Sequence, residues 1–207
     1  MTRVDHLVYG TPDLARGVAG IAQLLGVTPT PGGQHPGRGT RNALVSLGVG
    51  TYLEIVGPDP EQPAPVGGRM FGVDALAQPR LVTWCASASD LDGLQAEAHR
   101  HGVSLGAVAS GGRRGSDGQT LSWRFTEPSA LVEGGVVPFF IDWGPSPHPS
   151  ATAAPGAVLI GLRATHPDPA RAERMLRALH LDLAVTSGAR AELIATIDSP
   201  RGRVELR

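Results

Sequence analysis

Hydrophobic and polar residues alternate over the first ten positions of the chain. Residues 3–10 therefore predict a strand, with His6 and Val8 on one face and Asp5 and Leu7 on the other. A strand that carries a leucine on one face and a histidine on the other is typical of a sheet with one packed face. The face of Leu7 is the one expected to pack under a helix.

After this strand the pattern changes to a helical period and then returns to strands. Thr11 is expected to cap a helix whose apolar residues recur every three to four positions. A loop rich in Gly and Pro, residues 28–40, leads to a predicted hairpin of residues 42–47 and 51–56. Residues 1–57 thus predict a module of one strand, one helix and further strands.

This order of elements recurs twice. The later strands and helices are predicted at residues 81–86, 89–102, 103–108, 120–126 and 136–143, and again at 158–165, 167–179, 183–186, 191–197 and 203–206. The pattern predicts an α+β fold of repeated βαβββ modules over residues 1–57, 81–144 and 157–207. The first two are expected to form a curved mixed sheet with a ligand cleft in its concave face, and the third to follow at the C-terminus.

Composition narrows the class of protein. The 207 residues are 41% hydrophobic and 18% charged, with a formal net charge of -1, so neither disorder nor a nucleic-acid or membrane partner is expected. All 18 basic residues are Arg, which excludes a lysine Schiff base. Cys85 is the only cysteine, which excludes an intrachain disulfide. Without a signal peptide or a long apolar run, we expect a cytoplasmic protein.

Several short motifs resemble those of a known group of proteins. They are Asp5-His6-Leu7-Val8-Tyr9, Tyr52-Leu53-Glu54-Ile55-Val56-Gly57-Pro58, residues 35–43, Asp117-Gly118 with Leu121-Ser122-Trp123, and residues 138–144 with His148-Pro149. The chain resembles the vicinal oxygen chelate superfamily of glyoxalase I, extradiol dioxygenases and bleomycin-resistance proteins. Within it, the chain looks most like the bacterial glyoxalase-like domain family. The resemblance implies the same bowl of βαβββ modules over nearly the whole chain.

The resemblance also implies a candidate metal site. In metal enzymes of the superfamily, ligands come from the first and last strands of each module, and His6 and Glu54 occupy those positions in the first module. The corresponding positions of the second module hold Thr83 and Ile141, which leaves the ligand set incomplete. A histidine from a loop, either His35 or His148, is the alternative source of a third ligand.

Ligand contacts are expected from several other side chains. Arg113 can clamp an anionic group, and His35 can approach the ligand from its loop; solvated loop positions are the other interpretation of both. Aromatic residues of the second module are expected to form the cleft walls or the core: Trp84, Trp123, Phe139 and Trp143. No nucleotide cofactor is expected, because the Gly-x-Gly of residues 48–50 lies in a hairpin turn.

Two functions follow from the resemblance. The first is an enzyme of isomerase, lyase or dioxygenase type that acts next to a carbonyl or vicinal oxygens. A divalent metal of unspecified identity would be bound by His6 and Glu54, or Glu54 would act as the base without one. The second is a metal-free protein that sequesters a small molecule. The third module, which a two-module bowl does not need, is open to a structural role or a homodimer interface.

Overall fold

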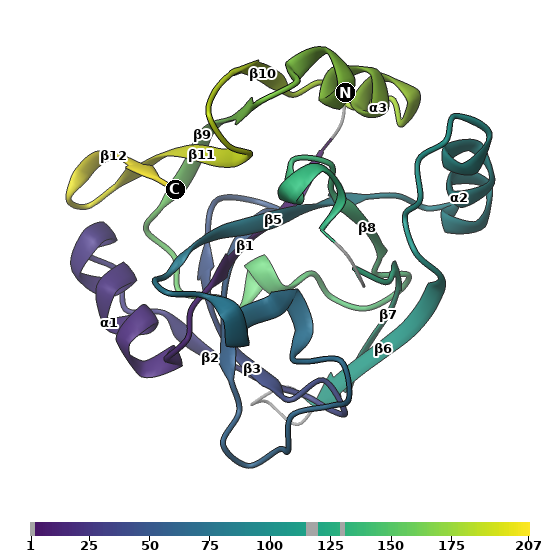
Figure 1. The fold of residues 1–207 in the computed structure, drawn as a ribbon. Coiled ribbons are helices and arrows are strands. Elements are labelled where there is room, and N and C mark those ends of the chain that lie inside the picture. The colour runs from purple at the N-terminus through teal and green to yellow at the C-terminus, as the bar shows by residue number, and fades with distance from the viewer. Residues whose placement is uncertain (1–2, 115–119, 129–130) are drawn as a thin grey trace.

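The first two rounds of elements form one sheet. A computed structural model describes residues 3–114, 120–128 and 131–207, without the side chains of Arg113 and Arg114. In these residues a curled, mixed sheet of eight strands has the order β2-β3-β4-β1-β5-β8-β7-β6 (Figure 1). Its strands are β1 (Val4–Gly10), β2 (Thr30–His35), β3 (Thr40–Ser46), β4 (Tyr52–Pro58), β5 (Arg80–Ser87), β6 (Val108–Arg114), β7 (Thr120–Thr126) and β8 (Phe139–Asp142).

The third round forms a separate four-stranded sheet in the order β10-β9-β11-β12. Its strands are β9 (Val158–His166), β10 (Ala184–Ser187), β11 (Glu192–Ser199) and β12 (Gly202–Leu206). The helices are α1 (Leu14–Leu25), α2 (Leu91–Arg100) and α3 (Pro169–Ala178), with short 3₁₀ turns at η1 (Met70–Ala75), η2 (Val132–Gly135) and η3 (Pro149–Ala151). The predicted α+β fold of repeated βαβββ units around a curved mixed sheet is confirmed.

Each long helix begins at an aspartate. Asp13, Asp90 and Asp168 accept a hydrogen bond from the backbone N–H three residues later, which satisfies a donor that the first turn leaves free. Thr11, the predicted cap of α1, is instead buried, and its backbone N–H donates to Val56. Gly26 ends α1 in the left-handed conformation, with φ of 71°, as its sequence position predicts.

Two strands lie where the pattern did not predict them. β2 falls inside the predicted loop of residues 28–40, and β6 begins where the predicted strand of residues 103–108 ends. Both are edge strands rich in glycine, and each is held by antiparallel pairing with one neighbour, β3 or β7. Local alternation therefore carries little signal there, because backbone pairing rather than side-chain burial defines these strands.

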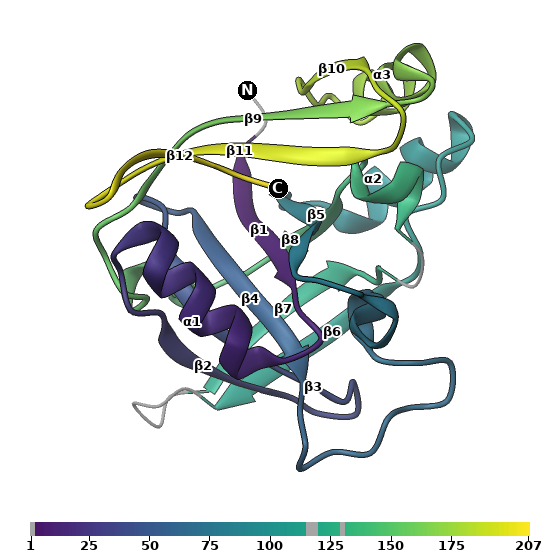
Figure 2. The same cartoon turned by 60° about the vertical axis from the view of Figure 1, so that its left-hand side comes forward.

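The two faces of the eight-stranded sheet differ. Leu7, Leu53 and Trp84 lie on the convex face, in a large core shared with α1, α2 and the second sheet. Figure 2 shows the second sheet beside α1, where β11 contacts β5 and β12 contacts α1. Val8 and Phe139 belong to a smaller cluster on the concave face. None of the described helices has both the length and the apolar character needed to cross a membrane.

Candidate functional site

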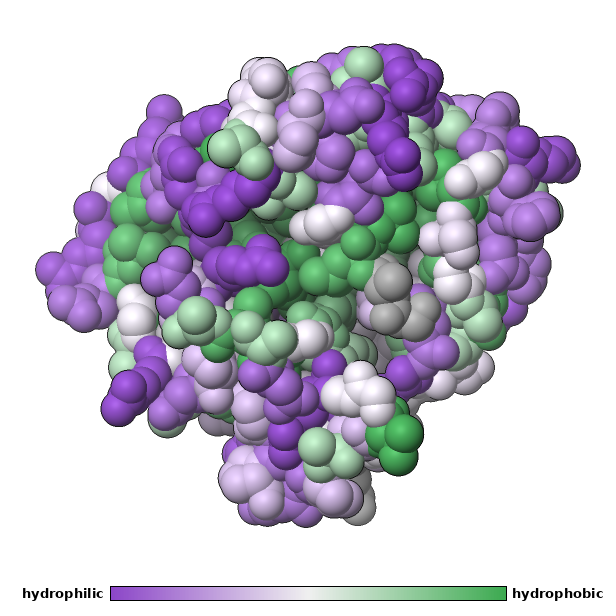
Figure 3. All heavy atoms as spheres, in the orientation of Figure 1, coloured by the Kyte–Doolittle hydropathy of each residue, from purple (hydrophilic) through white to green (hydrophobic). Residues whose placement is uncertain are grey.

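A cavity opens on the concave face, between the two halves of the eight-stranded sheet. Its volume is about 330 Å³, at the small end of the range for sites that hold small organic molecules. Figure 3 shows hydrophobic residues gathered across the recessed middle of this side of the molecule. Strands β1 to β4 contribute His6, His35, Asn42, Tyr52 and Glu54 to the lining, whereas β7, β8 and the residue after β8 contribute Trp123, Phe125, Phe139, Ile141 and Trp143.

The Glu54 carboxylate lies between two imidazoles. Its Oε1 is 3.3 Å from His35 Nε2 and accepts a hydrogen bond of 2.5 Å from Asn42 Nδ2. Its Oε2 is 3.7 Å from His6 Nε2, which is longer than a hydrogen bond. His35, Asn42, Glu54 and His6 stand on β2, β3, β4 and β1, which are consecutive in the sheet. Four neighbouring strands thus each supply one polar side chain.

Each histidine is held through its other ring nitrogen. His6 Nδ1 is 2.8 Å from Asp5 Oδ1, and His35 Nδ1 is 2.9 Å from Thr40 Oγ1. The Tyr52 ring stacks on the His6 ring, with centroids 4.6 Å apart and an interplanar angle of 20°. Both imidazoles therefore turn Nε2 toward Glu54, and these contacts fix the orientation of the rings.

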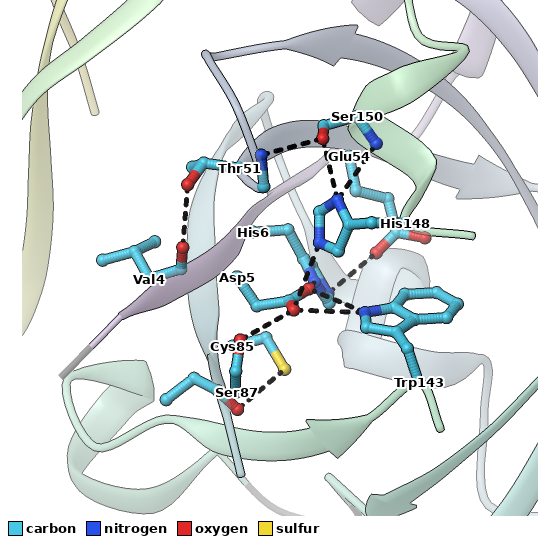
Figure 4. Close-up of polar contacts among 12 residues, drawn as sticks. Val4, Asp5, His6, Thr51, Glu54, Cys85, Ser87, Trp143, His148 and Ser150 are labelled. Carbon is cyan, nitrogen blue, oxygen red and sulfur yellow. Dashed lines mark hydrogen bonds and ion pairs between the residues drawn. The ribbon is translucent and has the colours of Figure 1, made fainter. Parts of the chain in front are cut away.

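A β-bulge brings Asp5 to the side of His6. Val4 pairs with Ala86 and His6 with Cys85, so Asp5 is an extra residue of β1 between two successive pairs. The bulge interrupts the alternation, and Asp5 contacts His6 instead of pointing away from it, as Figure 4 shows. Strict alternation predicts Asp5 on the opposite face from His6, because it does not allow for such an insertion.

The two carboxylates are ionised despite their burial. Burial raises the pKa of Glu54, but hydrogen bonding to His35, the charges of His35 and His6 and the Asn42 amide outweigh it and lower the pKa to about 2. Burial also raises the pKa of Asp5, and hydrogen bonds and charges from His148 and His6 hold it well below its usual range. A carboxyl with so low a pKa is a poor general base near neutral pH.

An aromatic wall faces this polar group. The Trp123 and Trp143 rings lie 5.2 Å apart at 53°, and Trp143 Nε1 donates to Asp5 Oδ2 at 3.1 Å. Trp123 lies against the backbone of β6, where a Cβ on Gly111 would come within 2.5 Å of the indole. The glycine therefore allows the Trp123 ring to lie close to the strand.

The donor set around Glu54 fits a divalent cation. His6 Nε2 and His35 Nε2 each face the ionised Glu54 carboxylate, at different oxygens, and a partner on each Nδ1 orients each ring, as is usual for metal-bound histidines. Among the described residues, the group whose ligand atoms all lie within 4.8 Å of one another is a different one, Asp5, His6 and Cys85. That second group fits less well: four donors already occupy Asp5, and burial and nearby carboxylates raise the pKa of the Cys85 thiol.

The structure brings most of the predicted site residues together. His6, His35, Glu54, Trp123, Phe139 and Trp143 line the cavity. Trp84 does not: it is 1% exposed on the convex face, where its Nε1 donates to the Val136 carbonyl. Of the two positions expected for this tryptophan, it therefore occupies the core, and the expected ligand contact is wrong. The reason is its position in β5, where it alternates with Cys85 on the concave face.

Two further predictions concern Arg113 and His148. Arg113 lies on β6 opposite Leu121 rather than in a loop, and its side chain is outside the described residues. His148 contacts Asp5 at 3.3 Å and is not part of the described cavity lining, so His35 is the histidine that reaches Glu54.

Sequence reasoning missed Asp5, Asn42 and Tyr52. Tyr52 precedes Glu54 by two positions and so shares its strand face, which is a usable signal. Asn42 shares a face with Leu44, which lies opposite Glu54 on β3. Asp5 carried no such signal, because its position depends on the bulge.

Residues 4–180 match the glyoxalase-like domain family. None of the curated proteins compared with the chain matches it. Among solved structures, a hypothetical protein from Staphylococcus aureus is similar with a TM-score of 0.65 and 15% identity, over 99% of this chain and 84% of that chain. That similarity shows the fold.

Two epimerase structures are less similar in fold. Methylmalonyl-CoA epimerase from Mycobacterium tuberculosis has a TM-score of 0.44 and 19% identity, over 69% of this chain and 88% of that chain. A Streptomyces coelicolor methylmalonyl-CoA epimerase in complex with 2-nitronate-propionyl-CoA has a TM-score of 0.46 and 21% identity, over 70% and 97%.

Proposed function

Since the chain belongs to the glyoxalase-like domain family, we propose that it is a small-molecule enzyme of isomerase, lyase or dioxygenase type, as expected from its resemblance to the vicinal oxygen chelate superfamily. Its substrate carries a carbonyl or vicinal oxygens. The observation that carries this proposal is the buried, ionised Glu54 between His6 Nε2 and His35 Nε2, opposite an aromatic wall. A carboxylate with a strongly lowered pKa at the wall of a cavity is typical of a functional site.

His6, His35 and Glu54 are the residues that would hold a divalent metal. When bound, such an ion supplies positive charge that polarises the oxygens of a ligand. Glu54 contributes a fixed negative charge. Its pKa of about 2 suits a residue that binds a metal better than it suits a general base, the other role expected for Glu54.

The aromatic wall has a different task. Trp123, Phe139 and Trp143 offer apolar area against which the non-reacting part of a small molecule can pack, and they exclude water from the polar end. We propose that the reacting oxygens lie toward Glu54 and the apolar part lies against the indoles.

A second function has its own support. The paired indoles of Trp123 and Trp143 suit a planar ligand, and a protein that sequesters such a compound needs no chemistry. The two functions differ in one respect that can be measured: an enzyme consumes its ligand, whereas a sequestering protein binds it without change.

Metal analysis and ligand turnover test the proposal. Chelator-free protein is analysed for metal by mass spectrometry, together with His6→Ala, His35→Ala and Glu54→Ala and the exposed control His99→Ala. Near-stoichiometric metal in the wild type and the control, lost in the three site variants, supports the metal assignment. Absent metal, with no thermal shift on adding Mn²⁺, Ni²⁺ or Zn²⁺, contradicts it.

The ligand arm uses a panel of phenylglyoxal, 2-hydroxyacetophenone, mandelate and catechol. Binding is followed by tryptophan fluorescence and turnover by loss of the compound. Consumption that depends on Glu54 supports the enzyme. Binding without consumption supports sequestration and overturns the enzyme, and no binding of any member overturns both.

A further inference from the structure

We propose that Asp5 is a positioning residue that holds the His6 proton on Nδ1, so that the Nε2 lone pair faces Glu54 and the cavity. This inference rests on the proposed function, in which His6 acts through Nε2. It adds a residue that the superfamily's ligand positions do not include, and it assigns a defined tautomer to His6.

Four donors converge on the Asp5 carboxylate. His6 Nδ1 lies 2.8 Å from Oδ1, and Ser87 Oγ, Trp143 Nε1 and His148 Nε2 lie 3.0, 3.1 and 3.3 Å from Oδ2. Figure 4 shows all four side chains directed at this one group. Asp5 is 1% exposed, so these contacts determine its surroundings.

The contacts around Asp5 indicate where the His6 proton lies. The Trp143 indole N–H can only donate, and Ser87 Oγ also donates to Asp5, so the carboxylate is the acceptor of this cluster and the ring nitrogen of His6 that faces it carries a hydrogen. In a neutral imidazole the other nitrogen, Nε2, is then bare. A bare Nε2 is what either metal binding or proton acceptance at this position requires.

The position of Asp5 also links the two halves of the cavity. His6 belongs to β1, whereas Ser87 ends β5 and Trp143 follows β8. A single carboxylate therefore holds both the imidazole of the polar side and one indole of the aromatic wall. Displacing it would move both sides of the cavity at once.

Nitrogen NMR of the histidine rings in metal-free protein at pH 8 tests the inference. His6→Gln assigns the His6 signals, and the nitrogen shifts distinguish a protonated ring nitrogen from a bare one. We expect His6 protonated on Nδ1 and bare on Nε2 in the wild type. In Asp5→Asn, whose amide cannot accept from all four donors, we expect a mixture or the reverse tautomer. Ser87→Ala removes one donor but leaves the carboxylate, so its His6 tautomer should match the wild type.

The contrary results are equally defined. The proposal is overturned if wild-type His6 is protonated on Nε2, either alone or together with Nδ1. It is also overturned if the His6 tautomer is unchanged in Asp5→Asn. If Asp5→Asn fails to fold, as judged by circular dichroism, the wild-type spectrum alone decides. None of these readouts depends on metal or turnover.

Cobalt binding provides a second readout. If wild-type protein binds Co²⁺, Asp5→Asn should weaken the affinity by about 10- to 100-fold, as loss of an orienting carboxylate usually does, whereas Ser87→Ala should change it by less than about 3-fold. Equal affinities in Asp5→Asn and wild type overturn the positioning role. If the wild type binds no Co²⁺, the metal part of the proposed function fails while the NMR result still decides the role of Asp5.

Discussion

The two halves of the eight-stranded sheet have the same order of elements but line the cavity with opposite chemistry. Strands β1 to β4 bring histidines, an amide and a carboxylate. In the other half, the position that sequence alignment matched to Glu54 holds Ile141, and tryptophans and phenylalanines complete the lining. The half formed by β1 to β4, the polar half, offers groups that can take part in a reaction. The half formed by β5 to β8, the aromatic half, offers apolar surface for ligand binding. Repetition of a module thus allows one copy to keep charged groups while the other supplies apolar area.

The largest expected effect concerns Trp84, which belongs to the aromatic half but lies on the convex face of the sheet, away from the cavity. Trp84→Ala should lower the free energy of unfolding by about 3–5 kcal/mol, because a fully buried indole is lost from the convex core. Urea denaturation measures this. Trp84→Phe, which keeps most of the ring, should leave binding of the panel compounds unchanged. A clear loss of binding in Trp84→Phe would mean that Trp84 contributes to ligand binding, and would contradict the separate roles of the two faces.

The second prediction concerns the polar half and pH. The pKa of Glu54 is lowered from 4.5 to about 2, so its contribution is present above about pH 4.5 and is lost as pH falls toward 2. The difference in unfolding free energy between wild type and Glu54→Gln should therefore shrink by up to about 3 kcal/mol across this window. Glu205→Gln, an exposed control, should show a far smaller change. A difference that stays constant from pH 6 to pH 2.5 would contradict an ionised, partnered Glu54.

Gly111→Ala should lower the free energy of unfolding by about 1–3 kcal/mol, because it disturbs packing in the aromatic half. The added Cβ would lie 2.5 Å from the Trp123 ring, so the indole has to move. Thermal unfolding and tryptophan fluorescence report stability and ring position. Gly161→Ala on β9 is the matched control, because a Cβ there meets nothing within 4 Å. Equal behaviour of the two variants would show that Trp123 does not lie against β6.

The smallest expected effect tests directly whether the polar half and the aromatic half have separate tasks. Trp123→Leu should weaken binding of the tightest panel compound by about 10-fold, the loss expected for one aromatic contact, while metal content stays as in the wild type. Fluorescence titration through the remaining tryptophans, with metal analysis alongside, measures both. Loss of metal in Trp123→Leu would mean that the two halves do not have separate tasks.

Sequence alone predicted much of this fold, and the reasons for its failures are local. Strands with an apolar face, such as β1, β4 and β5, and helices with a glycine stop were placed within a few residues. Edge strands β2 and β6 were missed or displaced because their residues bury little. His6 and Glu54 were found through strand faces and resemblance, whereas the partnership of His35 with Glu54 required the pairing of β2 with β3.

The bulge in β1 makes the length of a strand as important as its residues. A related chain that kept an aspartate followed by a histidine but lacked one residue before them would send the two side chains to opposite faces. Two sequences that share the Asp-His pair in an alignment would then have different sites. Insertions and deletions near Val4 are therefore a better guide to which relatives share this arrangement than the Asp-His pair itself.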